Sequence, residues 1–65
     1  KYIMKLGCLV RYRHKSFAIP EKHIPQGTLG VVTNVSSFLW GVQWLGVDFL
    51  RYHFEHDLEV VNESR

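Results

Sequence analysis

The sequence predicts a small, closed, all-β barrel of five strands, and three observations lead to this prediction. Residues 6–14 alternate between an apolar face and a partly charged face, as a half-buried strand does. Glycine and turn-forming residues separate further runs of β-branched and aromatic residues at short intervals. Apolar residues nowhere follow the spacing of three and four that marks an amphipathic helix. The 65 residues form one domain, 1–65, because a chain this short has room for a single core.

The first strand is expected over residues 6–14, with Val10 on its buried face and Cys8 as a small core residue. A long first loop follows over residues 15–26, where Pro20 and Pro25 interrupt any regular element. Phe17 and Ile19 are expected to attach this loop to the barrel. Met4 can be the native start, with residues 1–3 left from expression.

The second strand is expected over residues 29–35 with Val32 in the core, and Gly30 permits a bulge or a sharp bend where the strand begins. Residues 34–37 form a turn, and the third strand spans residues 38–44 with Val42 and Trp44 inward and Gln43 outward. A turn over residues 45–48 leads to a fourth strand at 49–54. A one-turn helix at 55–57 precedes the closing strand at 58–61, where Leu58 is expected in the core.

The charges are unevenly distributed, although the net charge is only +2. The beginning of the chain is basic and the end is acidic (Lys1, Lys5, Arg11, Arg13 and Lys15 against Glu55, Asp57, Glu59 and Glu63). Since the last strand of a small barrel often lies beside the first, these charges are expected to pair across strands and fix their register. The alternative is a dipolar face that binds a charged partner.

Three segments carry a resemblance that spans most of the chain. They are Leu-Gly-Cys-Leu-Val-Arg-Tyr at 6–12, Ile-Pro-Gln-Gly-Thr-Leu-Gly-Val-Val at 24–32 and Phe-Glu-His-Asp-Leu-Glu-Val-Val at 54–61. Each resembles an element of the SH3-like barrels, and similar segments occur in the nitrile hydratase β subunit and in the variable chain of ferredoxin–thioredoxin reductase. The resemblance implies a five-stranded SH3-like barrel. It implies no particular function, because this barrel serves many unrelated tasks.

No catalytic residues, metal ligands or cofactors are assigned from the sequence. The serines lack a nucleophile-elbow motif, and His53 and His56 have no second pair of ligands with which to complete a zinc site. Val42-Gln43-Trp44-Leu45 faintly resembles the Val-Gln-Ile-Tyr strand of type II dihydrofolate reductase, which forms a four-barrel pore. Trp44 and Leu45 replace its isoleucine and tyrosine, and Tyr12 stands where that family has its pore lysine. A pore-type enzyme, or a subunit of an enzyme complex, is therefore the remote alternative.

The sequence instead favours a small, non-enzymatic interaction module that binds a protein partner, associates with itself, or does both. Nine aromatic residues exceed what so small a core can hold, and the excess side chains suit an interface. The expected surface combines apolar and cationic side chains (Phe17, Trp40, Tyr52, Arg11, Arg13 and Arg51). Trp40 is equally consistent with the core.

The second candidate partner is nucleic acid, bound through the basic first strand, where Arg11 and Arg13 can meet phosphates about 6–7 Å apart. No stretch of the sequence is long and apolar enough for a membrane span, so no membrane partner is expected. The single cysteine, which excludes an intrachain disulfide, suits a reducing compartment and predicts a cytoplasmic protein.

Overall fold

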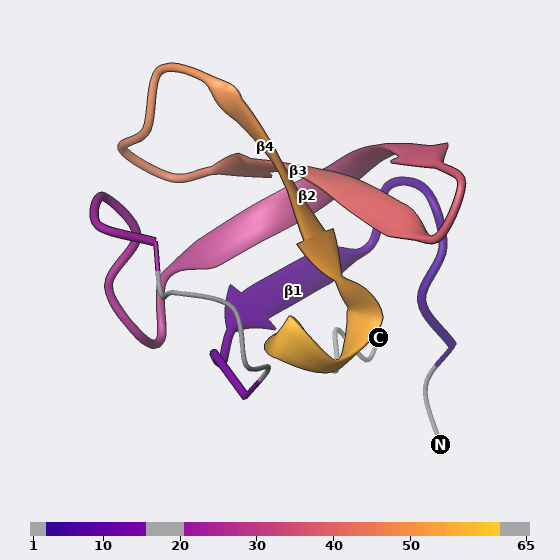
Figure 1. The fold of residues 1–65 in the computed structure, drawn as a ribbon, viewed down its shortest axis with the longest axis horizontal. Coiled ribbons are helices and arrows are strands. Elements are labelled where there is room, and N and C mark those ends of the chain that lie inside the picture. The colour runs from indigo at the N-terminus through magenta and orange to yellow at the C-terminus, as the bar shows by residue number, and fades with distance from the viewer. Residues whose placement is uncertain (1–2, 16–20, 62–65) are drawn as a thin grey trace.

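Five antiparallel strands form one sheet in the computed structural model, which describes residues 3–15 and 21–61 (Figure 1). The strands are β1 (Leu9–Tyr12), β2 (Leu29–Ser36), β3 (Leu39–Trp44), β4 (Leu50–Phe54) and β5 (Leu58–Val60). A single 3-10 turn, η1 (Glu55–Asp57), connects β4 to β5. The all-β class, the five strands and the helical turn before the last strand are confirmed.

The sheet is not closed among the described residues, which differs from the expected closed barrel. Its strand order is β4-β3-β2-β1-β5, so β4 and β5 are the two edges. The three residues of η1 carry the chain from the end of β4 to the free side of β1, where Tyr12 pairs with Leu58 and Val10 with Val60. Figure 1 shows β4 and η1 curling over β1. With only three residues, β5 extends the sheet along β1 and forms no ladder with β4.

The first strand is shorter than expected, four residues instead of nine. Gly7 has a φ of 86°, which interrupts the extended backbone before Leu9. The N–H of Arg13 still donates to the carbonyl oxygen of Asp57 at 2.9 Å. Beyond it, the N–H of His14 donates to Oε1 of Gln26 at 3.0 Å, and the N–H of Lys15 donates to Oδ1 of Asp57 at 2.7 Å. These side-chain acceptors end β1 because they replace its strand partners.

The core lies on the inner face of the sheet and contains all five side chains that the alternation placed there. Val10, Val32, Val42, Trp44 and Leu58 are each at most 7% exposed, and the predicted core residue Cys8 is buried with them. Tyr12 and Ile24 complete the cluster. Ile24 anchors the segment between β1 and β2 to the core. The expected anchors Phe17 and Ile19 lie outside the described residues.

Gly30 is needed for a close approach of side chains and not for the bulge that was expected there. The irregularity in the β2–β3 ladder falls between Val32 and Asn34. At Gly30, a Cβ atom would lie 2.6 Å from Cε3 of Trp44 and 2.7 Å from Cγ1 of Val42. Glycine leaves the space in which the Trp44 indole packs across β2.

Candidate functional site

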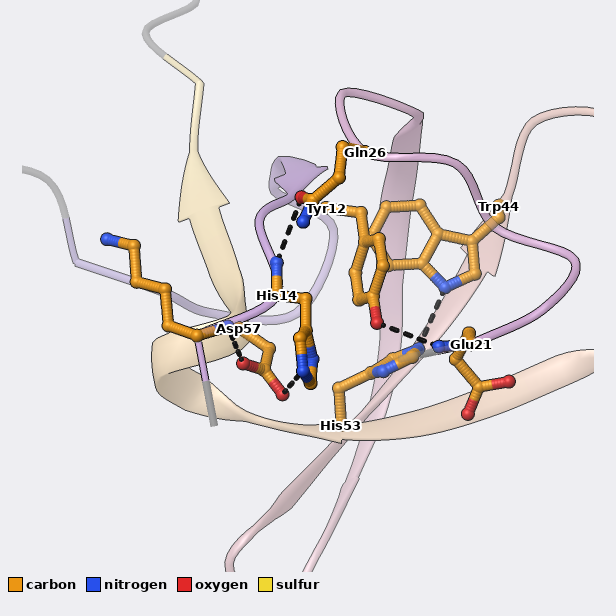
Figure 2. A network of polar contacts seen from close by, with 8 residues as sticks. Tyr12, His14, Glu21, Gln26, Trp44, His53 and Asp57 are labelled. Carbon is orange, nitrogen blue, oxygen red and sulfur yellow. Dashed lines mark hydrogen bonds and ion pairs between the residues drawn. The ribbon is translucent and has the colours of Figure 1, made fainter. Parts of the chain in front are cut away.

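A network of polar and aromatic side chains from β1, β3, β4, η1 and the described parts of the segment before β2 lies at one end of the core (Figure 2). At its centre, Nε1–H of Trp44 donates a hydrogen bond to Nε2 of His53 at 3.0 Å, and both residues are buried. The ring of Tyr12 packs against both, with centroid distances of 5.6 Å to Trp44 and 5.4 Å to His53. The Tyr12 hydroxyl accepts a hydrogen bond from the N–H of Glu21 at 3.2 Å.

His53 is held neutral by this environment. Burial lowers its pKa below 6.5, although the nearby carboxylates of Glu21 and Asp57 act in the opposite direction. The hydrogen bond from Trp44 requires a lone pair on Nε2, so the proton of the neutral ring is on Nδ1. The hydrogen bond and the lowered pKa therefore both favour the neutral imidazole of His53.

A pocket of about 80 Å³ opens beside His53, lined by Tyr12, His14, Glu21, Leu39, Tyr52, His53, Phe54 and Asp57. Nδ1 of His14 lies 3.9 Å from Oδ2 of Asp57 on one wall of it. Small-molecule sites usually have about 300–1,000 Å³, so this pocket suits a few water molecules at about 30 Å³ each. The polar network thus joins the loop to the sheet and offers little space for a substrate.

Arg11 and Arg13 share one carboxylate. The Arg11 guanidinium lies 3.4 Å from Oε1 of Glu59, and Nε of Arg13 lies 3.1 Å from the same oxygen. Arg11 and Glu59 are also direct partners in the β1–β5 ladder. The predicted pairing of charges across the first and last strands is therefore confirmed for these residues.

The predicted binding residues do not form one surface. The β3–β4 register places Trp40 beside the buried His53, and Trp40 packs partly buried against the core. Nε of Arg51 lies 3.5 Å from Oε1 of Glu21 without hydrogen-bond geometry, and its Cζ lies 4.4 Å above the Phe49 ring.

Tyr52 is 39% exposed, and its hydroxyl accepts a hydrogen bond from Nδ2 of Asn34 at 2.5 Å. It alternates with His53 along β4, so it lies on the face opposite Trp40. Arg11 on β1 is separated from Tyr52 on β4 by the two strands β2 and β3. Phe17 lies outside the described residues. The binding role of this set stays a prediction.

The outer face of the sheet carries an apolar surface that the sequence analysis did not single out. Leu9 pairs with Val31, Val31 with Gln43 and Gln43 with Leu50, which forms a straight row across four strands. We call this the outer row. A shallow depression of about 430 Å³ lies along it, and none of its lining residues is charged (Leu9, Leu29, Gly30, Val31, Gln43, Trp44, Leu45 and Gly46). The alternation predicted an outward Gln43, and only the register shows that its neighbours on that face are aliphatic.

A second exposed surface is a stack of three aromatic rings at the far end of the β2–β3 hairpin. The rings of Phe38 and Phe54 are 5.9 Å apart with an angle of 4° between planes, and Phe54 and His56 are 5.7 Å apart with 0°. All three side chains are exposed, Phe38 at 68% and Phe54 at 37%. We call these residues the aromatic stack. The sequence did not predict this stack, because Phe38 is distant in sequence from Phe54 and His56 and only the fold brings the three rings together.

No protein-family model, curated protein or solved structure matches this chain. Among residues 3–15 and 21–61, no group of three or more His, Cys, Asp or Glu side chains is arranged to hold a metal ion. The same residues include no helix with the length and apolar character needed to cross a membrane. The function of this molecule is therefore inferred from its surfaces.

Proposed function

We propose that this protein is a small interaction module that associates with a second copy of itself through the outer row. The observation that carries the proposal is the uninterrupted line from Leu9 through Val31 and Gln43 to Leu50. Val31 is 41% exposed and Leu50 is 39% exposed, and Leu45 beside them is 76% exposed. Contiguous exposed apolar surface of this kind marks an interaction site more often than isolated apolar residues do.

A second copy fits this surface because the row is close to symmetric. A two-fold axis between Val31 and Gln43 would place Leu9 of each copy opposite Leu50 of the other, as an isologous interface requires. The residues that line the depression carry no charge, and the charges of Arg11 and Glu59 on the same face are paired with each other. The Gln43 amide already donates to the carbonyl of Val47 at 2.7 Å, which reduces the cost of covering it.

The size of the molecule is compatible with such an interface. A stable interface buries about 800 Å² on each partner, and the chain exposes 4599 Å². The outer row spans four of the five strands, so two sheets packed face to face about 10 Å apart would cover most of this face. The added burial would supplement the small core of eight buried apolar residues.

The proposal includes an SH3-like curl of the sheet and a cytoplasmic location. The curl is supported by the order of elements, with the 3-10 turn directly before a last strand that pairs with the first. The location is supported by Cys8, whose thiol is only 8% exposed among core residues and has no disulfide partner in the chain.

The test is sedimentation and light scattering of the chain from micromolar to millimolar concentration. We expect a monomer–dimer equilibrium that Val31→Lys shifts to monomer, because the lysine places an unpaired charge in the centre of the interface. Val35→Lys is the matched control: Val35 is also on β2, it is 46% exposed, and it is not part of the row. A chain that stays monomeric throughout, or equal effects of both substitutions, would contradict the proposal.

A further inference from the structure

The aromatic stack ends beside a groove that contains cationic side chains. His56, the last ring of the stack, lines a groove of about 460 Å³ together with Arg13, Lys15 and Glu59. The His56 imidazole is parallel to the Phe54 ring, and the residue is exposed at the groove. This volume is within the range of sites that hold a ligand the size of a nucleotide.

A second groove lies on the other side of the same cationic residues. It has a volume of about 480 Å³ and is lined by Arg13, His14, Lys15, Gln26 and Gly27, with no acidic residue. Arg13 and Lys15 line both grooves and therefore form a ridge between them. We call this pair the basic ridge.

Cations and carboxylates around the basic ridge are equal in number (Arg11, Arg13 and Lys15 against Glu55, Asp57 and Glu59), but none of the carboxylates lines the second groove. Glu59 is paired with both Arg11 and Arg13, so one positive charge remains among these three residues. The Lys15 ammonium adds a second positive charge and has no ion-pair partner within the described residues. Glu55 on the wall of the first groove opposes one of them. An anion in the second groove would therefore meet Arg13 and the unpaired Lys15 with no lining carboxylate to oppose it.

We propose that the basic ridge and the aromatic stack bind single-stranded nucleic acid. Phosphates contact Lys15 and Arg13 on the ridge, and a base in the first groove stacks on the exposed His56 ring. The neighbouring nucleotide occupies the second groove, where the Gln26 side chain and the Gly27 backbone line the wall. Sequence-independent binding of single strands combines these two elements, a cationic track and exposed rings on which bases stack. The site is separate from the outer row, with which it shares no residue.

The experiment measures fluorescence anisotropy of labelled oligothymidylate and oligouridylate at several salt concentrations. We expect micromolar or weaker binding with a logarithmic salt slope of about −0.7 for each phosphate contacted. Lys15→Gln should reduce that slope by about 0.7. His56→Ala should weaken binding about fivefold or more and leave the slope unchanged, since it removes a stacking surface and not a phosphate contact.

Two further variants separate this site from a general effect of charge. Lys22→Gln removes the same charge from an exposed position that lines neither groove, and should leave affinity nearly unchanged. Glu59→Gln frees Arg11 and Arg13 and should tighten binding, a gain that a misfolded variant cannot produce. The proposal is overturned by no binding at low salt, by equal effects of Lys22→Gln and Lys15→Gln, or by polyglutamate binding that equals oligothymidylate binding, which would indicate an acidic protein partner.

Discussion

Trp44 and His53 are hydrogen-bonded to each other across neighbouring strands, although the ladder partner of His53 is Trp40. The Trp44 indole reaches back along the core to meet the imidazole edge to face, at 78° and with 5.4 Å between centroids. A hydrogen bond between two buried side chains stabilises the fold only while both keep the required protonation state. This pair therefore makes the stability of the protein depend on pH.

Unfolding should become easier as the pH falls below about 6.5. Burial lowers the pKa of His53 in the folded state, so below 6.5 the unfolded chain binds more protons at this site than the folded chain. The free energy of unfolding therefore rises with pH through this window and is fully regained above it. Urea denaturation at about pH 7.5 and about pH 5.5 checks this. His53→Gln, which keeps an acceptor for Trp44, should show a smaller difference, and an equal difference would contradict the assignment.

Gly30→Ala should destabilise the protein by about 1–3 kcal/mol, the usual cost of overpacking a core. The added methyl would meet the indole of Trp44 at 2.6 Å and the backbone oxygen of Gln43 at 2.9 Å, and neither can move without disturbing β3. Thermal denaturation is the measurement. Gly41→Ala is the comparison: its added methyl would meet the ends of the Asn34 and Tyr52 side chains and no backbone atom among its nearest neighbours, so the loss should be smaller even if their hydrogen bond is displaced. A larger loss of stability in Gly41→Ala than in Gly30→Ala would show that Trp44 repacks easily.

Ile24→Ala should cost about 2–5 kcal/mol, as truncation of a buried aliphatic side chain does. Ile24 is 1% exposed and attaches the segment between β1 and β2 to the core. The matched control is Ile3→Ala, because Ile3 is 79% exposed and should change stability by no more than about 0.5 kcal/mol. Chemical denaturation of both variants measures the difference. Similar small losses in both would mean that Ile24 does not hold the loop.

Glu59→Gln should lower stability by no more than about 1 kcal/mol for each of its two ion pairs, because exposed pairs are weak. The Glu59 side chain is 48% exposed, and those of Arg11 and Arg13 are 35% and 51% exposed. About half of the loss or more should disappear in about 1 M salt, where the Debye length of about 3 Å is close to the distances within these pairs. Denaturation at low and high salt tests this. A loss that persists in high salt would show that Glu59 acts through packing.

Local patterns were sufficient for much of the fold. Alternation identified the inward residues Val10, Val32 and Val42, and the acidic end was correctly expected to meet the basic first strand. Gly30 was expected to have a structural role, but the need for glycine there comes from Trp44, which packs over this position from another strand. Strand ends were less predictable because acceptors distant in sequence, such as Asp57, decide where β1 stops.

The surfaces were harder to predict because the register between strands decides which side chains become neighbours. No pattern within one strand shows that Leu9, Val31 and Leu50 lie in a row, and nothing in the sequence links Phe38 to His56. The expected set of Trp40, Arg11 and Tyr52 combined residues of suitable chemistry, but the fold divides them between two faces and distant strands. Residue types indicate which side chains are suited to binding, and strand pairing determines which of them lie on the same surface.

The position of β4 at the margin of the sheet determines how this molecule would misassemble. Among the described residues its backbone pairs with β3 on one side only, and its sequence Leu-Arg-Tyr-His-Phe consists of large residues that favour extended structure. A strand of this kind is a template for intermolecular ladders and fibrils. Arg51 is the one permanently charged residue within it and Glu55 directly follows it, so these two side chains oppose such growth.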